Sequence, residues 1–254
     1  MNPHRAAAAE SGEQAIWQQV EFGSYRADLP LWLELARSAG GPVLELGAGA
    51  GRVAVHLAEQ GVQVMALERE PELVAELEDR AMRLEEPFRV VRADLARPDE
   101  IRLPKEPGLV IAPLHVLQTL DPNGRLALIG ALRELVSPGA VLAAALVDES
   151  TLLSAGAAAT QILPDMREVD DRVYASEPLW VQVGEDRLTV RRVRERVSPE
   201  GERERVVHDE LLHRISPERL QLETQALDFR PAGTRAVRSG ANEADSVVVL
   251  LEAV

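Results

Sequence analysis

The fold is decided by one glycine-rich stretch, Glu45-Leu46-Gly47-Ala48-Gly49-Ala50-Gly51. A short apolar run, Val43 to Leu46, precedes the glycines, and a helical pattern from Gly51 to Gln60 follows them directly. Glycine adopts the torsions that such a turn requires, and the missing side chains let the backbone approach a ligand closely. We therefore expect a ligand at this strand end. Because Gly49 to Ala54 also fits the dinucleotide pattern G-x-G-x-x-G/A, the turn alone leaves two cofactor classes open.

The pattern around the turn predicts an α/β fold with a parallel sheet. From Pro42 to Val147 short apolar runs alternate with amphipathic stretches, which is typical of βαβ units. Helical spacing from Ala15 to Ser38 predicts helices before the first strand, after a leader at residues 1–15. The expected strands are Pro42 to Leu46, Gln63 to Leu67, Phe88 to Arg92, Gly108 to Ile111 and Ala140 to Leu146, with helices at Gly51 to Gln60, Pro71 to Leu84 and Asn123 to Leu135.

After Val147 the pattern changes and predicts an antiparallel insert at about 150–215, within one domain spanning residues 1–254. Ser198-Pro199-Glu200-Gly201 is a strong turn signal between two runs that alternate as strands do. Ser154 to Thr160 is expected to form a helix or a mobile lid. The expected strands of the insert are Leu179 to Val183, Arg187 to Val197 and Arg203 to Ile215, followed by a helix from Ser216 to Ala226 and by strands at Arg230 to Ala236 and Ser246 to Glu252.

The composition excludes several classes of function. The chain of 254 residues contains no cysteine, which removes disulfides, thiolate metal sites and a cysteine nucleophile. Its formal net charge of -14 would repel a phosphate backbone, and the arginines of Arg187 to Arg205 alternate with glutamates, as on a solvated strand face. No apolar run reaches the ~18 residues of a membrane span, and the N-terminal stretch lacks the apolar core of a signal peptide. We therefore expect a cytoplasmic protein that binds neither nucleic acid nor membrane.

Carboxylates stand at three successive predicted strand ends. Glu45 ends the first strand, Glu68 ends the second and Asp94 closes the third. A polar Glu45 in a buried strand favours a ligand with a positive group. Glu68 is placed to accept hydrogen bonds from ribose hydroxyls, and Asp94 to accept one from the adenine amine. Each acid alone also fits a helix N-cap or a solvated loop, but the three together favour a cationic adenosine ligand, S-adenosylmethionine (SAM), over a pyrophosphate.

The order and spacing of these motifs resemble class I SAM-dependent methyltransferases of the small-molecule type. The resemblance runs from Pro42 to Leu146 and rests on Glu45-x-Gly47-x-Gly49-x-Gly51, Glu68, Ala93-Asp94, and Leu135-Val136-Ser137-Pro138-Gly139. It implies a Rossmann-like seven-stranded sheet of order 3-2-1-4-5-7-6, with strand seven antiparallel and helices on both faces. The terminal pair of predicted strands resembles the last hairpin of that family.

The resemblance also implies a cofactor site. The glycine turn would hold the methionine moiety, Glu68 the ribose, and Asp94 with Leu95 the adenine edge. Tyr25 to Pro30 resembles the segment that covers the cofactor in many small-molecule members, where Arg26 would bind the SAM carboxylate or else remain a solvated arginine. The predicted cofactor-binding residues are Arg26, Glu45, Gly47, Ala48, Gly49, Gly51, Glu68, Arg69, Asp94, Leu95 and Pro113.

Fewer residues point to the acceptor of the methyl group. His115, just beyond the fourth strand, is the candidate catalytic base, with a structural histidine as the alternative. Tyr174 and Trp180 of the insert are candidate walls for a small organic acceptor, or a small core of the insert itself. His208 and His213 have an odd separation and face opposite sides of a strand, so no metal site is expected.

Three functions therefore stay open from the sequence. The first is a SAM-dependent methyltransferase (EC 2.1.1.-) that methylates an oxygen or nitrogen of a small molecule, with a homodimer as one assembly. The second is an NAD(P)-dependent oxidoreductase, which shares the glycine turn and the ribose acid. The third is a SAM-binding protein without turnover, because no catalytic base is assured.

Overall fold

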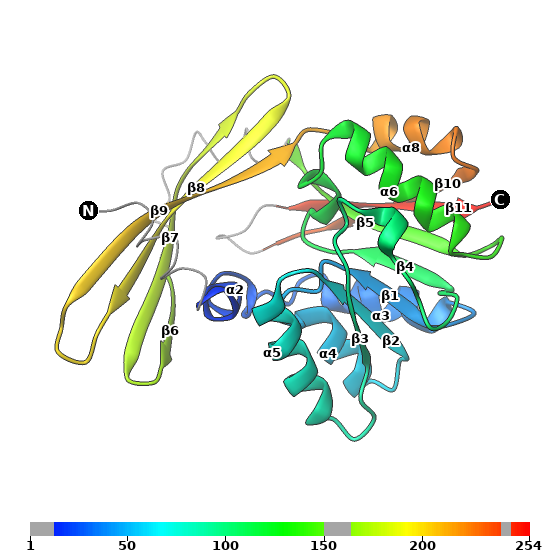
Figure 1. Ribbon diagram of the computed structural model, residues 1–254. Helices are drawn as coiled ribbons and strands as arrows, with labels where there is room; N and C mark the ends of the chain where they lie inside the picture. The colour runs from blue at the N-terminus through cyan, green and yellow to red at the C-terminus, as the bar shows by residue number, and fades with distance from the viewer. Residues whose placement is uncertain (1–12, 150–163, 240–244) are drawn as a thin grey trace.

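The computed structural model describes residues 13–149, 164–239 and 245–254, and these form two sheets with helices (Figure 1). The predicted lid from Ser154 to Thr160 and most of the leader lie outside the described residues. The first sheet contains β1 (Val43–Leu46), β2 (Val64–Glu68), β3 (Arg89–Arg92), β4 (Leu109–Ala112), β5 (Val141–Val147), β10 (Phe229–Val237) and β11 (Ser246–Ala253). The helices are α2 (Gln14–Phe22), α3 (Leu29–Ser38), α4 (Arg52–Glu59), α5 (Pro71–Met82), α6 (Pro122–Glu134) and α8 (Pro217–Gln225), with 3-10 turns η1 (Pro98–Glu100) and η2 (Val116–Gln118).

The first sheet has the strand order β10-β11-β5-β4-β1-β2-β3. Strands β1 to β5 pair in parallel, whereas β11 runs antiparallel to both β5 and β10. This is the order 3-2-1-4-5-7-6 with an antiparallel strand seven, so the predicted topology is confirmed. Because parallel strands end at one edge, the segments that follow β1, β2 and β4 meet there.

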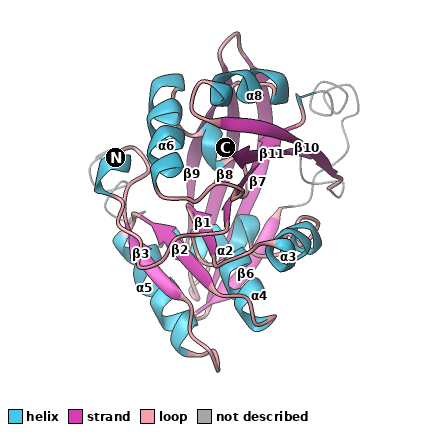
Figure 2. Ribbon diagram, turned by 90° about the vertical axis from the view of Figure 1, so that its right-hand side faces the viewer, coloured by secondary structure: helices cyan, strands magenta, loops and turns pink. Residues whose placement is uncertain are grey.

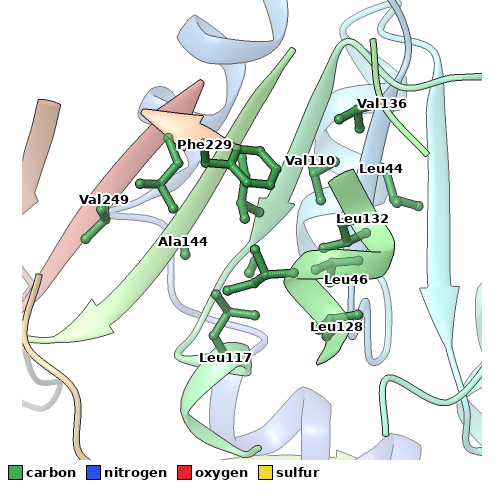
Figure 3. Close-up of a cluster of buried hydrophobic side chains, with 14 of the residues drawn as sticks. Leu44, Leu46, Val110, Leu117, Leu128, Leu132, Val136, Ala144, Phe229 and Val249 are labelled. Carbon is green, nitrogen blue, oxygen red and sulfur yellow. The ribbon is translucent and has the colours of Figure 1, made fainter. Parts of the chain in front are cut away.

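The first sheet has an apolar core on each face, and this explains why its central strands appear in the sequence as short apolar runs. In β1, Leu44 and Leu46 pack toward α6 and α8, whereas Val43 packs toward α3, α4 and α5. Figure 3 shows the first of these cores, with α6 carrying Leu128 and Leu132 onto the sheet. Helices therefore cover both faces (Figure 1, Figure 2), as predicted. Glu45 has the same parity as Val43 and lies on the face of α3 and α4.

The insert forms a second, antiparallel sheet of order β6-β7-β8-β9, comprising β6 (Asp165–Val169), β7 (Arg172–Val183), β8 (Arg187–Val197) and β9 (Arg203–His213). An antiparallel insert was predicted, but with three strands rather than four and with a shorter β7. β6 escaped prediction because its side chains are polar and largely exposed, which leaves no apolar alternation. Helix α2 lies between the two sheets (Figure 1) and packs on β7.

No helix among the described residues is long and apolar enough to cross a membrane.

Candidate functional site

The glycine turn adopts a conformation that requires glycine. The φ angles of Gly47, Gly49 and Gly51 are 59°, 58° and 86°, all in the left-handed region. A Cβ atom at Gly49 would stand 2.7 Å from the side-chain oxygen of Gln18, and one at Gly51 would stand 2.7 Å from a methyl group of Leu77. The turn thus leaves backbone, rather than side chains, facing the space in front of it.

That space is a cavity of about 240 Å³ between the turn, α2, the loop before α3 and the segment after β4. Gln18 and Phe22 of α2 close one side. Of the predicted cofactor-binding residues, Arg26, Glu45, Gly47, Ala48, Gly51 and Pro113 line the cavity.

Glu45 is a buried acid without a full set of partners. Its side chain is 2% exposed, and among the described residues no donor reaches its Oε2 atom. Burial raises the pKa of Glu45 to about 8, although the nearby Arg52 guanidinium and the backbone N–H of Ala54 lower it. A buried carboxyl with a vacant acceptor oxygen fits a ligand that brings a cationic hydrogen-bond donor, such as the ammonium group of SAM.

A buried ion pair fixes the segment that covers this cavity. Arg52 Nη1 donates to Asp28 Oδ1 at 2.6 Å, and Arg52 Nη2 donates to Asp28 Oδ2 at 2.7 Å. The Nε1 atom of Trp32 also donates to Asp28, at 2.8 Å, and the Arg52 guanidinium stacks 5.0 Å above the Tyr25 ring. Asp28 precedes α3 but makes no side-chain cap, because its oxygens are used by Arg52 and Trp32. The sequence did not single out this pair, since only the fold joins residues that far apart.

Arg26 lies at the exposed rim of the cavity. Its Nη1 atom donates to the carbonyl oxygens of Gly23 at 2.6 Å and Tyr25 at 2.9 Å. The guanidinium therefore holds its own loop, and its remaining N–H groups are those that an anionic ligand would use.

Glu68 braces the glycine turn from the neighbouring strand. Its Oε2 atom accepts from the backbone N–H of Gly49 at 2.9 Å, and its Oε1 accepts from the N–H groups of Arg69 and Glu70 at 2.7 and 3.0 Å. Oε2, which accepts only one of these bonds, still has a lone pair for a ligand hydroxyl. Neither Glu68 nor Gly49 lines the cavity.

The predicted adenine-binding residues lie further along the same edge. Asp94 Oδ1 accepts from the backbone N–H of Ala96 at 3.0 Å, and Arg69 Nη1 lies 3.9 Å from that oxygen. Leu95 packs against the core under α6. Asp94 thus stabilises its own turn, which was the alternative for this acid, and it does not line the cavity.

His115 follows β4 with a left-handed backbone, φ 66°. Its Nε2 atom lies 3.1 Å from the hydroxyl oxygen of Ser246, a partner that the sequence did not indicate. Burial lowers the pKa of His115 to about 4, opposed by the charge of Asp28, so the imidazole is neutral at pH 7. A base this weak removes a proton from an acceptor less readily than an ordinary histidine.

Tyr174 and Trp180 do not come together at the cavity. Tyr174 is 2% exposed, its ring packs edge-on against Trp17 at 5.2 Å, and its hydroxyl donates to Glu13 at 3.1 Å. Trp180 is 39% exposed, with the Arg191 guanidinium 4.7 Å above its ring. Tyr174 therefore joins a small core that α2 shares with β7, not one of the insert alone, and Trp180 lies outside it.

The second sheet docks on the side of α2 that faces away from the cavity. Arg194 Nε and Nη2 each donate to Glu21 at 2.8 Å, and the hydroxyl of Ser176 donates to Glu21 Oε1 at 2.8 Å. Burial alone would raise the pKa of Glu21, but the hydrogen bonds and charge of Arg194 outweigh burial and lower it. One helix therefore contacts both the cofactor cavity and the insert.

Comparisons with known proteins agree with this geometry. Residues 43–139 match a family described as a methyltransferase domain, and no curated protein matches the chain. The CcbJ methyltransferase from Streptomyces caelestis is 19% identical with a TM-score of 0.68, over 91% of this chain and 98% of that one. SAM-bound CalS10, an amino pentose methyltransferase from Micromonospora echinaspora, is 16% identical with a TM-score of 0.63, over 99% and 97%.

A third similar structure is the glycopeptide N-methyltransferase MtfA complexed with S-adenosyl-L-homocysteine (SAH). It is 20% identical with a TM-score of 0.63, over 100% of this chain and 99% of that one. At such identities the likeness establishes the fold, and the match to a methyltransferase domain covers residues 43–139. The resemblance to class I methyltransferases that the motifs indicated is confirmed.

Proposed function

We propose that this protein, a class I methyltransferase by its fold and by the match over residues 43–139, transfers a methyl group from SAM to a small molecule. The observation that carries the proposal is Glu45, a buried acid with a vacant oxygen on the wall of the cavity. A cation such as the ammonium or sulfonium group of SAM would favour the ionised form of Glu45, whose pKa is raised to about 8, and pair with it, whereas that form would repel the pyrophosphate of NAD(P).

The residues along the sheet edge support specific roles toward SAM. Glu45 pairs with the ammonium group, and the backbone of Gly47 to Gly51 makes room for the methionine moiety. Arg26 pairs with the carboxylate at the rim of the cavity. Glu68 accepts from a ribose hydroxyl while it holds Gly49, and Asp94 with Leu95 takes the adenine edge.

SAM supplies an electrophilic methyl group with a neutral leaving group. An acceptor oxygen or nitrogen would bond to the methyl carbon as the carbon–sulfur bond breaks, SAH would leave, and the proton of the acceptor would pass to solvent. Because the pKa of His115 is lowered to about 4, we propose that positioning and exclusion of water provide most of the acceleration. The same low pKa favours the second candidate, a SAM-binding protein without turnover.

The proposed acceptor is a small molecule. The solved structures that resemble this chain include an amino pentose methyltransferase, a sugar N-methyltransferase and a glycopeptide N-methyltransferase, which supports an acceptor of this class. The net charge of -14 supports an acceptor other than a nucleic acid.

The test is release of SAH from SAM in the presence of a library of small metabolites. We expect SAH to form with a subset of acceptors and a methylated product of matching mass. SAM binding without SAH release by any acceptor would favour the non-catalytic alternative. Reduction or oxidation of library members with NAD(P)(H), with no SAH formed, would contradict the proposal.

A further inference from the structure

The second sheet presents one face, here called the inner face, to α2 and to the end of β5. At one end of this face Leu188 and Leu212 pack against Val147, the last residue of β5. At the other end Arg194 binds Glu21 of α2. Helix α2 also lines the cavity at the glycine turn, and β5 neighbours β4, whose following residue Pro113 lines that cavity too. The stretch of the inner face between Val147 and Glu21 thus extends from the end of β5 to α2.

Glu210 lies on that stretch. In the register of β8 and β9, Leu188 pairs with Leu212, and the next pair on the same face is Val190 with Glu210. The following pair, Arg192 with His208, leads on toward Arg194 and α2. Glu210 is partly buried there, within the electrostatic reach of Glu21.

Within the described part of the chain, Glu210 differs from the other acids near this face because no hydrogen-bond or ion-pair partner contacts it. Glu21 is bound by Arg194, Asp165 lies 3.7 Å from Arg192, and Glu204 is bound by Arg196. Among the described residues Glu210 has neither a hydrogen bond nor an ion pair. The arginines beside Glu210 are thus committed to other acids, and its own carboxylate is left without a cation.

The local electrostatics of Glu210 agree with this picture. Burial and the negative charge of Glu21 raise the pKa of Glu210, and the charges of Arg192 and Arg194 oppose that rise only in part. A partly buried carboxylate in such surroundings is stabilised by an added cation, whereas a hydroxyl brings no charge and a carboxylate would be repelled.

We propose that Glu210 binds a protonated amino group of the acceptor, which makes the acceptor an amine-bearing small molecule. This inference rests on the proposed methyltransferase function and names the substrate class of the same site. The role is recognition through an ion pair, so the amino group bound by Glu210 is an anchor; because an ammonium group has no lone pair, the methylated atom is a different one.

The experiment measures binding of matched probes to the full-length protein saturated with SAH. Glucosamine and glucose form one pair, and tyramine and tyrosol form a second, each differing in one amine for one hydroxyl. Calorimetry should show, in at least one pair, that the amine binds about ten-fold or more tightly than the hydroxyl compound, and that Glu210→Gln removes this preference. An amine that never binds better than its partner, or a preference that survives in Glu210→Gln, overturns the proposal.

Asp209→Asn is the matched control, because it removes the same charge one residue away on the opposite face, where Asp209 is bound by Arg191. Asp209→Asn should keep the wild-type preference for the amine over the hydroxyl probe. If it loses as much of this preference as Glu210→Gln does, the preference depends only on the net charge of the protein. Both variants should bind SAH as the wild type does, which shows that the fold and cofactor site are intact. If the wild type fails to bind SAH, the proposed function itself fails, and the acceptor assignment falls with it.

Discussion

The two sheets present their chemistry in different ways. On the edge of the seven-stranded sheet, Glu45 and the glycines that follow it are contiguous in sequence, and the turn that they form is set by local backbone torsions. On the inner face of the second sheet, the pKa of Glu210 is set by burial and by charges on other elements, such as Glu21 of α2. The proposed SAM site is thus formed by residues adjacent in sequence, whereas the proposed acceptor site depends on contacts between segments distant in sequence.

The largest effect is expected at the turn itself. Gly49→Val puts a side chain where Gln18 already stands and forces a left-handed φ on a β-branched residue, so we expect SAM binding to be lost. Calorimetry with SAM would measure the affinity of each variant. Gly61→Ala is the control, because Gly61 has a φ of +75° but open space around it; it should destabilise the fold by about 1 kcal/mol and keep SAM affinity. An equal loss of SAM affinity in both variants would show that backbone strain, and not the position of Gly49 in the glycine turn, weakens SAM binding.

The buried pair of Arg52 and Asp28 tests whether the donor site also depends on a distant contact. Asp28→Asn leaves the Arg52 charge buried and unpaired, so we expect the free energy of unfolding to fall by about 3 kcal/mol and SAM affinity to weaken. Chemical denaturation and calorimetry measure the two effects. Asp209→Asn, at an exposed pair, should change neither. Unchanged stability in Asp28→Asn would contradict the role given to this pair.

Replacing Glu45 should have an effect of intermediate size: SAM binding should weaken, whereas the folded protein should become more stable at pH 8. Glu45→Gln removes the charge that pairs with the SAM ammonium, so SAM affinity should fall by about 1 to 3 kcal/mol. Because burial raises the pKa of Glu45 from 4.5 to about 8, the folded protein holds a proton that the unfolded chain releases, and stability falls as pH rises between these values. Glu45→Gln should therefore be more stable than the wild type at pH 8, as thermal unfolding would show.

The pH dependence of SAM binding follows from the same group. A cation prefers ionised Glu45, so wild-type affinity should increase as pH rises toward 8 and level off above it, whereas Glu45→Gln should lack this dependence. Parallel pH profiles for the two proteins would mean that another group is responsible.

The smallest effect on SAM binding is expected at His115. Its imidazole contacts Ser246 and does not line the cavity, so His115→Ala should leave SAM affinity within about two-fold of the wild type. With an identified acceptor, a large loss of turnover at unchanged SAM affinity would restore His115 as the catalytic base; a small loss would support positioning as the main contribution.

The sequence predicted β1, β2, β4 and β5 of the first sheet well because each is short, apolar and buried. It placed the glycine turn and Glu45 at one strand end, which is where the structure has them. The pair of Asp28 with Arg52 could not be predicted, because neither residue has a distinctive neighbour pattern and only the folded chain brings them together.

The insert was less predictable for a related physical reason. β6 is mostly polar and exposed, and on the inner face of β8 Arg194 pairs with Glu21 of α2 while Arg192 faces Asp165 of β6. The sequence therefore indicated a solvated strand face for Arg187 to Arg205, although Arg194 is largely buried against Glu21. A homodimer and a cytoplasmic location stay predictions.

Calorimetric titration of the ligand-free protein with SAM, SAH and NADH tests the central claim most directly. The buried, partly unpaired Glu45 beside the glycine turn predicts that SAM and SAH bind and that NADH does not. Tight binding of NADH without binding of SAM would contradict the account.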